Sequence, residues 1–168
     1  FADDATRILR AVRYMARLDL ALAPDTAVLL RRDLHHMDGI SGDRIRHELA
    51  RLLDEEAALL ALGVASELGV LAAVHPALNV GSEVLEKLPT ATGRLTLLAA
   101  LTYGADAASM PGLIRRLNMD SEWSRVVCDT ASVAGDVAVL GKPDFKPSRV
   151  HAALRRRHPA AIQACAPA

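Results

Sequence analysis

Apolar residues recur every three or four positions along most of the 168-residue chain. Five apolar residues of the first segment fall within about a third of a helical wheel, namely Ile8, Ala11, Val12, Met15 and Leu18. The opposite side of this wheel carries Arg10, Arg13 and Arg17. The spacing predicts an amphipathic helix with one face in a core and the other on solvent or a ligand.

Proline and glycine residues divide the rest of the chain into further helices. Pro24 suits a first helical turn, so we expect a second helix from 24 to about 37, before the Asp38-Gly39 turn. Ser41 is expected to cap a third helix over 43–55. The same periodicity predicts helices over 55–68, 70–75, 81–88, 93–101, 110–118, 121–140, 147–157 and 159–165.

The composition favours an all-α fold built as a multi-helix array. Aromatic residues make up only 3% of the chain, and residues that prefer strands are scarce. With 51% hydrophobic residues, the chain is long enough to bury a core. The helical pattern breaks near residue 80, so we predict two packed helical subdomains, over about 1–78 and 79–168.

Several protein classes are disfavoured by what the sequence lacks. Cys128 and Cys165 stand far apart, outside any zinc-ligand spacing, which is typical of a reduced intracellular protein. No apolar run reaches the roughly 18 to 20 residues of a membrane span, and no signal-peptide pattern is seen. We therefore expect a cytoplasmic protein with no membrane partner, whose oligomeric state the sequence leaves open.

Charge is distributed unevenly although the formal net charge is zero. Residues 141–168 carry six lysines and arginines against one aspartate. Such a basic stretch indicates either a polyanionic partner such as RNA or a solvated helix face, and the two readings are equally weighted. The candidate RNA-binding residues are Lys142, Lys146, Arg149, Arg155, Arg156 and Arg157.

The residues alone indicate no catalytic or metal site. The chain has no His-Asp dipeptide of the kind used by helical metal-dependent hydrolases, and His35 to Asp38 reads better as a surface turn. Phosphate-binding glycine motifs are absent, and no serine or cysteine nucleophile with a recognisable neighbour stands out.

The start of the first helix is more informative. Asp3 and Asp4 are followed one turn later by Arg7, although a helix N-terminus disfavours cations. A surface salt bridge would explain the pair, and so would a recognition site. A carboxylate that accepts and a guanidinium that donates together match the Watson–Crick edges of cytosine and adenine, and mismatch those of uracil and guanine.

Three stretches resemble a known family in order and spacing. FADDATRILRAVRYMARL, SGDRIRHELARLL and LGVLAAVHPAL are similar to segments that follow the catalytic head in class II tRNA nucleotidyltransferases and bacterial poly(A) polymerases. The resemblance is specific over about residues 1–78 and only general beyond them. It implies a helical neck and body in a parent enzyme that adds C and/or A from CTP and ATP to tRNA 3′ ends, or A to RNA.

The resemblance also implies roles for individual residues. Asp4 and Arg7 match the family's template for the incoming base. Arg44 and Glu48 match residues thought to brace the nucleotide-binding end of the neck, and Asp3 and Arg10 are placed with them as supporting residues.

The family's catalytic motifs are missing from these 168 residues. Neither the G-G-x-V-R-D strand-turn nor the D-x-D metal carboxylates occurs, so we expect no cofactor in this chain, with Mg²⁺ bound instead by a head outside it. Phe1 in place of an initiator methionine suggests part of a longer protein, and we expect this part to be inactive alone. The alternative is a non-catalytic helical RNA-binding or scaffolding module that retains the family fold.

Overall fold

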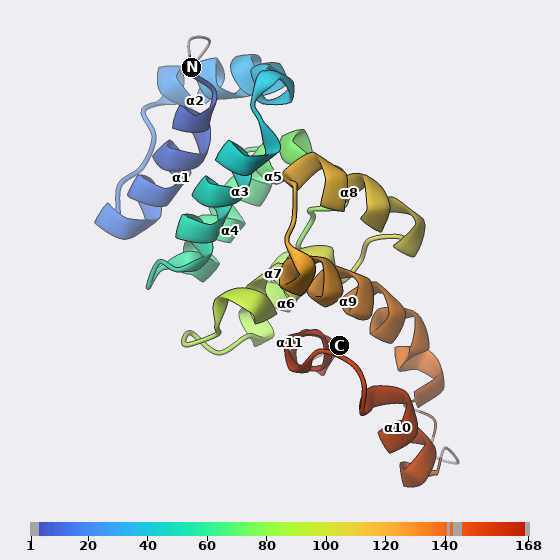
Figure 1. Cartoon of the computed structure of the whole chain (residues 1–168). Coiled ribbons are helices and arrows are strands. Elements are labelled where there is room, and N and C mark those ends of the chain that lie inside the picture. Colours follow the sequence, from blue (N-terminus) through green and yellow to red (C-terminus); the bar gives the residue numbers. More distant parts are fainter. Residues whose placement is uncertain (1–3, 141, 143–145, 167–168) are drawn as a thin grey trace.

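The computed structural model describes residues 4–140, 142 and 146–166, and these residues form helices and no strand (Figure 1). The all-α prediction is therefore confirmed. The first part of the chain contains α1 (Thr6–Leu18), α2 (Pro24–Asp33), the 3₁₀ helix η1 (Leu34–Gly39), α3 (Gly42–Leu53), α4 (Ala58–Glu67) and α5 (Val70–Val74). The second part contains α6 (Ser82–Lys87), α7 (Arg94–Thr102), η2 (Ala107–Ser109), α8 (Met110–Leu117), α9 (Ser121–Leu140), α10 (Pro147–Leu154) and α11 (Pro159–Cys165).

The expectation of one α-helix over 24–37 is wrong at its C-terminal end. The α-helix ends at Asp33, and the chain tightens into η1. The end of η1 is bound by α8, where the guanidinium of Arg116 donates to the carbonyl oxygens of Met37 at 2.7 Å and Ile40 at 2.9 Å. The Met37 carbonyl also accepts the Ile40 backbone N–H at 3.1 Å, so a 3₁₀ turn ends the segment and a distant side chain holds it.

The first helix is buried over a wider face than its apolar stripe predicts. α1 lies against both α3 and α4, so Leu9 and Ala16 are buried as well as Ile8 and Val12. Leu18, predicted on the core face, is 58% exposed. Arg13, predicted on the polar face, is only 9% exposed, which corrects that assignment.

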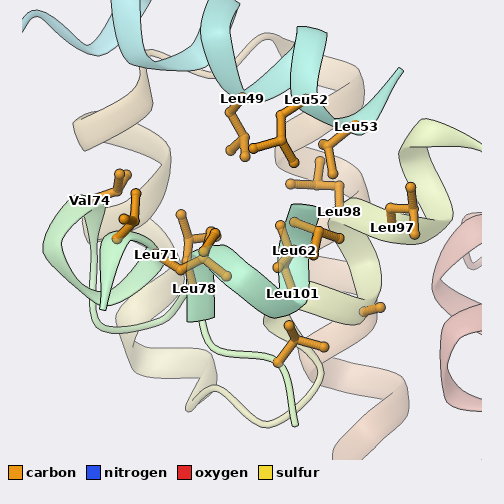
Figure 2. Close-up of a cluster of buried hydrophobic side chains, with 14 of the residues drawn as sticks. Leu49, Leu52, Leu53, Leu62, Leu71, Val74, Leu78, Leu97, Leu98 and Leu101 are labelled. Atoms are coloured by element: carbon orange, nitrogen blue, oxygen red, sulfur yellow. The ribbon is translucent and has the colours of Figure 1, made fainter. Parts of the chain in front are cut away.

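The buried apolar side chains form one continuous cluster from Ala5 to Ala164. Figure 2 shows leucines of α3, α4 and α7 converging, with Leu71 and Val74 of α5 beside them. The cluster crosses the position near residue 78 where the sequence predicts a boundary. The division into two subdomains stays a prediction.

The start of α3 touches the end of α8 with no room for a side chain. A Cβ atom added at Gly42 would lie 2.3 Å from the carbonyl oxygen of Arg116. Ser41 occupies the N-cap position as expected, but its side chain makes no capping hydrogen bond. A glycine contact, together with the Arg116 guanidinium, therefore joins α3 to α8.

Among the described residues, no single helix is long and apolar enough to cross a membrane. Arg94–Thr102 and Ala107–Leu117 reach the required length and composition only as a pair, and they are bent by 114° relative to each other.

Candidate functional site

Asp4 lies at the N-terminal end of α1, where its carboxylate is held by the next turn of the chain. Its Oδ1 atom accepts hydrogen bonds from the Thr6 backbone N–H at 3.1 Å and from the Thr6 hydroxyl at 2.6 Å. The Thr6 side chain is buried, so it supports the carboxylate from below. This is a side-chain cap of the helix start, since the Thr6 N–H has no partner within the helix.

Arg44, at the start of α3, reaches across to the same carboxylate. Its Nη2 atom donates to Asp4 Oδ1 at 3.1 Å and to Oδ2 at 3.2 Å. The structure thus brings together two residues that lie 40 positions apart and that the sequence placed in one site. The pair is partly solvated, with side-chain exposures of 28% for Asp4 and 56% for Arg44.

Arg7 is exposed one turn along α1, and the described contacts include no hydrogen bond from it to Asp4. Its charge nevertheless acts on the carboxylate. The Thr6 hydroxyl is the largest cause that lowers the pKa of Asp4, followed by the Thr6 backbone N–H and the charges of Arg44 and Arg7. Asp4 is therefore an ionised acceptor at neutral pH.

The carboxylate retains unused acceptor capacity on one side. Among the described residues, Oδ1 accepts three hydrogen bonds, whereas Oδ2 accepts only one, from Arg44. A carboxylate oxygen has about two lone-pair sites, so Oδ2 has room for another donor. The N-terminal end of α1 therefore offers an acceptor at Asp4 and a solvated cationic donor group at Arg7.

Glu48 is not a partner of Arg44. It is 9% exposed and accepts a hydrogen bond from Arg51 Nη1 at 2.8 Å, while its Oε2 lies 3.7 Å from Arg13 Nη2. Arg13 also donates from Nη1 to Glu55 Oε1 at 3.1 Å. Burial of Arg13 disfavours its charge, but the carboxylates outweigh this and its pKa is raised.

This ion cluster of Arg13, Glu48, Arg51 and Glu55 was missed by sequence reasoning. The signal was present in the helical spacing, because Arg13 follows Leu9 by four positions and precedes Ala16 by three, on the same buried stripe. Arg13 ties α1 to α3 and to the turn after it. It therefore fixes how α1, which carries Asp4, lies on α3, which carries Arg44.

The other predicted site residues are dispersed. Arg10 is exposed on α1, and Asp3 lies outside the described residues. The helix predicted over 147–157 ends at Leu154, so the three consecutive arginines follow it in a turn. Lys142, Lys146, Arg149, Arg155 and Arg156 are all exposed.

Arg157 differs from the other basic residues. Its guanidinium donates to Asp129 Oδ1 at 3.1 Å and to Ser132 Oγ at 2.6 Å, both on α9. The second oxygen of Asp129 accepts the His158 backbone N–H at 2.8 Å. Arg157 thus has an evident structural function in tying the chain between α10 and α11 to α9.

The described residues contain no group of three or more histidine, cysteine, aspartate or glutamate side chains arranged to hold a metal ion.

Comparison with known families defines the class of protein. Residues 19–81 match the family described as "Probable RNA and SrmB-binding site of polymerase A". The matched segment contains α2 to α5 with η1, but not Asp4 or Arg7. Over this segment the chain is similar to that RNA-binding family of polymerase A.

The particular relatives are the CCA-adding enzymes. A multifunctional CCA protein of Chromobacterium violaceum is 40% identical over 78 residues, which cover 45% of this chain and 19% of that protein. One from Burkholderia mallei is 39% identical over 82 residues, covering 47% of this chain and 20% of that protein. These homologues confirm the resemblance drawn from the sequence, and the chain spans about a fifth of their length.

Solved structures show the same fold over nearly the whole chain. A CCA-adding enzyme in complex with ATP matches with a TM-score of 0.78 and 20% identity, over 99% of this chain and 44% of that one. The Thermotoga maritima CCA-adding enzyme complexed with tRNA matches with a TM-score of 0.77 and 20% identity, over 99% of this chain and 45% of that one. The fold is therefore that of a helical region of CCA-adding enzymes.

Proposed function

We propose that this chain is the base-selecting and RNA-holding part of a template-independent nucleotidyltransferase that adds C and/or A to tRNA 3′ ends. The observation that carries the proposal is the homology to multifunctional CCA proteins over 78 residues at 40% identity. The fold supports it over the rest of the chain, since 99% of the residues align with CCA-adding enzymes. The solved relatives include complexes with ATP, CTP and tRNA.

Base selection rests on Asp4 and Arg7. Cytosine and adenine each present an exocyclic amino donor beside a ring-nitrogen acceptor, and uracil and guanine present the reverse. Oδ2 of Asp4 accepts from the amino group, and the Arg7 guanidinium donates to the ring nitrogen. A wrong base leaves the paired polar groups of the site without partners, which costs about 1–3 kcal/mol for each buried group.

Arg44 and Thr6 hold the carboxylate in one orientation. Together they make four hydrogen bonds to Asp4, so the orientation of Oδ2 is set before a nucleotide arrives. This preorganisation makes the site selective, because a freely rotating carboxylate also accommodates other bases.

The chemistry of transfer belongs to a part of the protein outside this chain. Nucleotidyl transfer uses carboxylates that hold Mg²⁺, and the described residues provide no such set. The exposed basic residues after α9 supply phosphate contacts to RNA, which are independent of sequence.

The base-selection proposal is tested in the full-length protein that contains this chain. Asp4→Ala and Arg7→Ala are each expected to reduce the preference for CTP and ATP over UTP and GTP by about 10- to 100-fold, because each variant loses one of the two pairing groups. The measurement is the relative incorporation of each nucleotide into tRNA lacking its 3′ end. Arg17→Ala, an exposed arginine at the far end of α1, is the matched control. Unchanged discrimination in both site variants would contradict the template role.

The isolated chain distinguishes the enzyme from a non-catalytic module. We expect it to incorporate no nucleotide in the presence of CTP, ATP and Mg²⁺, whereas the full-length protein extends tRNA. Incorporation by the isolated chain would refute the placement of the catalytic carboxylates elsewhere. A full-length protein that binds RNA without extending it would instead support the module.

A further inference from the structure

A cavity that does not include Asp4 is lined by residues of η1, α5 and α8; α5 and α8 lie near each other in Figure 1. Its volume is about 440 Å³, within the range of roughly 300–1,000 Å³ usual for small-ligand sites. The polar lining consists of His35, Asp38, His75 and Arg116. The remainder is apolar and comes from Leu34 and the stretch 72–76.

The tautomer of His75 is fixed by the backbone. Its Nδ1 atom accepts the backbone N–H of Ala77 at 3.1 Å, so in the neutral ring the proton is on Nε2. Burial, and secondarily the charge of Arg116, lowers the pKa of His75, which keeps the ring neutral at neutral pH. None of the described hydrogen bonds uses Nε2, which therefore presents a donor.

Gly112 of α8 lies beside this nitrogen. A Cβ atom at this position would lie 3.3 Å from His75 Nε2. Because residue 112 is a glycine, no methyl group lies against His75 Nε2, the ring nitrogen that carries the proton.

His35 presents the complementary group. Its Nδ1 lies 2.9 Å from the carbonyl oxygen of Arg32, and since a carbonyl only accepts, the proton is on Nδ1. Nε2 of neutral His35 is then an acceptor, and the ring is supported by that of His36, with centroids 4.0 Å apart. Arg116 is fixed by its bonds to Met37 and Ile40. The residues that line the cavity therefore include one histidine whose free ring nitrogen donates and one whose free ring nitrogen accepts, beside an apolar surface.

We propose that this cavity binds an unpaired nucleobase of RNA. A base edge presents donors and acceptors side by side on a flat apolar ring, and unpaired bases are the parts of RNA that proteins read in pockets. The Asp38 carboxylate in the lining disfavours a phosphate but accepts from a base. Exposed Arg31 on the adjoining turn of α2 provides positive charge for a flanking phosphate, whereas Arg32 is paired with Asp33 at 2.7 Å.

The inference rests on the proposed function as far as it takes RNA to be the partner. All the lining residues except Arg116 lie within residues 19–81, the segment that matches the polymerase A family. It adds a second base-binding position, separate from Asp4 and Arg7 and serving bound RNA, not the incoming nucleotide.

Two substitutions separate the two nitrogens of His75. His75→Asn keeps an acceptor near the position of Nδ1 for the Ala77 N–H and removes the donor at Nε2. His75→Gln places an amide N–H near the position of Nε2 and removes the acceptor. The probes are single-stranded hexaadenylate and hexauridylate, with a fully paired RNA duplex as the control ligand.

We expect His75→Asn to weaken binding of at least one single-stranded probe by about tenfold and to leave duplex binding unchanged, since one hydrogen bond to the base is lost. His75→Gln should retain most of the affinity. In the unsubstituted chain, the ¹⁵N signal of His75 Nε2 should shift on addition of the same probe, which tests the contact without any variant.

Equal affinity of His75→Asn together with an unshifted His75 signal overturns the cavity assignment and leaves the proposed function standing. Failure of the chain to bind either single-stranded probe or the duplex overturns both the cavity assignment and the RNA-holding role.

Discussion

At the scale of the residue, Thr6 is the residue that does most to keep the Asp4 carboxyl group ionised. Both donors of Thr6, its N–H and its hydroxyl, bond to the same carboxylate oxygen. The hydroxyl is the largest cause that lowers the pKa of Asp4. An acid whose pKa is lower in the folded state stabilises that state above its unfolded pKa, and this contribution is lost as the pH falls toward the folded pKa.

We therefore expect Thr6→Val, which keeps the shape of the side chain but removes the hydroxyl, to raise the pKa of Asp4 toward its ordinary value. The acid-dependent loss of stability should become smaller in this variant. NMR titration of the Asp4 carboxyl signal measures the pKa, and thermal unfolding from neutral to acidic pH measures the stability. Thr6→Ser retains the hydroxyl and should keep the low pKa; an equally low pKa in Thr6→Val would show that the backbone N–H and the arginines suffice.

The sequence predicted part of this site. Asp4, Arg7 and Arg44 were recognisable from motif spacing, and the structure joins Asp4 to Arg44 by two hydrogen bonds. The contact of Glu48 with Arg13 was not predicted, because an amphipathic pattern counts every arginine as polar and does not register a long side chain that pairs with carboxylates inside a helix interface. The assignments of Asp4 and Arg7 to base selection stay predictions.

At the scale of the element, the ion cluster controls how α1 sits on α3. Arg13 and Glu48 are each 9% exposed, and removing one partner of a buried pair leaves the other charge unpaired in a poorly solvated place. The cluster is incompletely satisfied even in the folded chain, since Arg13 Nε and Glu48 Oε2 have no hydrogen-bond partner among the described residues.

Arg13→Ala is expected to lower the free energy of unfolding by about 1–3 kcal/mol, because Glu55 loses its cation and Glu48 keeps only Arg51. Urea denaturation of the isolated chain gives this value. Arg17→Ala, at an exposed position of the same helix, should change it by no more than about 0.5 kcal/mol. Similar values for the two variants would mean that the cluster contributes little.

The junction of α3 and α8 makes a second prediction at this scale. Gly42→Ala would place a Cβ 2.3 Å from a backbone oxygen that no side-chain rotation moves. We expect a loss of about 1–3 kcal/mol from this overpacking. Gly81→Ala is the matched control, since it also stands at a helix start and nothing lies within 4 Å of the added Cβ. Thermal unfolding of both variants measures the loss. Equal melting temperatures would show that the contact between α3 and α8 adjusts to the added methyl group.

Helix positions followed from apolar periodicity with small errors, except after Asp33. There the sequence indicated a longer α-helix, whereas the chain forms η1, whose end is bound by Arg116 of another helix. Apolar periodicity depends on the neighbouring residues alone, so it gives no information about a hydrogen-bond donor 79 positions away.

At the scale of the whole molecule, the basic stretch after α9 divides into two roles. Arg157 is paired with Asp129, whereas Arg155 and Arg156 are exposed. If RNA lies on this surface, only the exposed arginines pair with its phosphates and release the counterions bound there. Each phosphate contact contributes about one unit to the slope of log affinity against log salt concentration.

We expect Arg155→Ala combined with Arg156→Ala to weaken tRNA binding and to reduce the slope of log affinity against log salt concentration by roughly two. The measurement is a salt series of binding titrations on the full-length protein. Arg17→Ala serves as the control for loss of an exposed charge elsewhere. An unchanged slope would leave these arginines as a solvated surface.

The hydrogen bond from Arg116 to Ile40 spans 76 positions in the chain, and it has a consequence for synthesis. Translation proceeds from the N-terminus, so the residues of α1 to α5 are joined before Arg116. Until Arg116 is made, the carbonyls of Met37 and Ile40 lack its guanidinium, and the start of α3 has no α8 backbone beside Gly42. Closing a long loop has an entropic cost, so these contacts form late. The connection between η1 and α3 therefore reaches its final form only after α8 has been made and has packed against it.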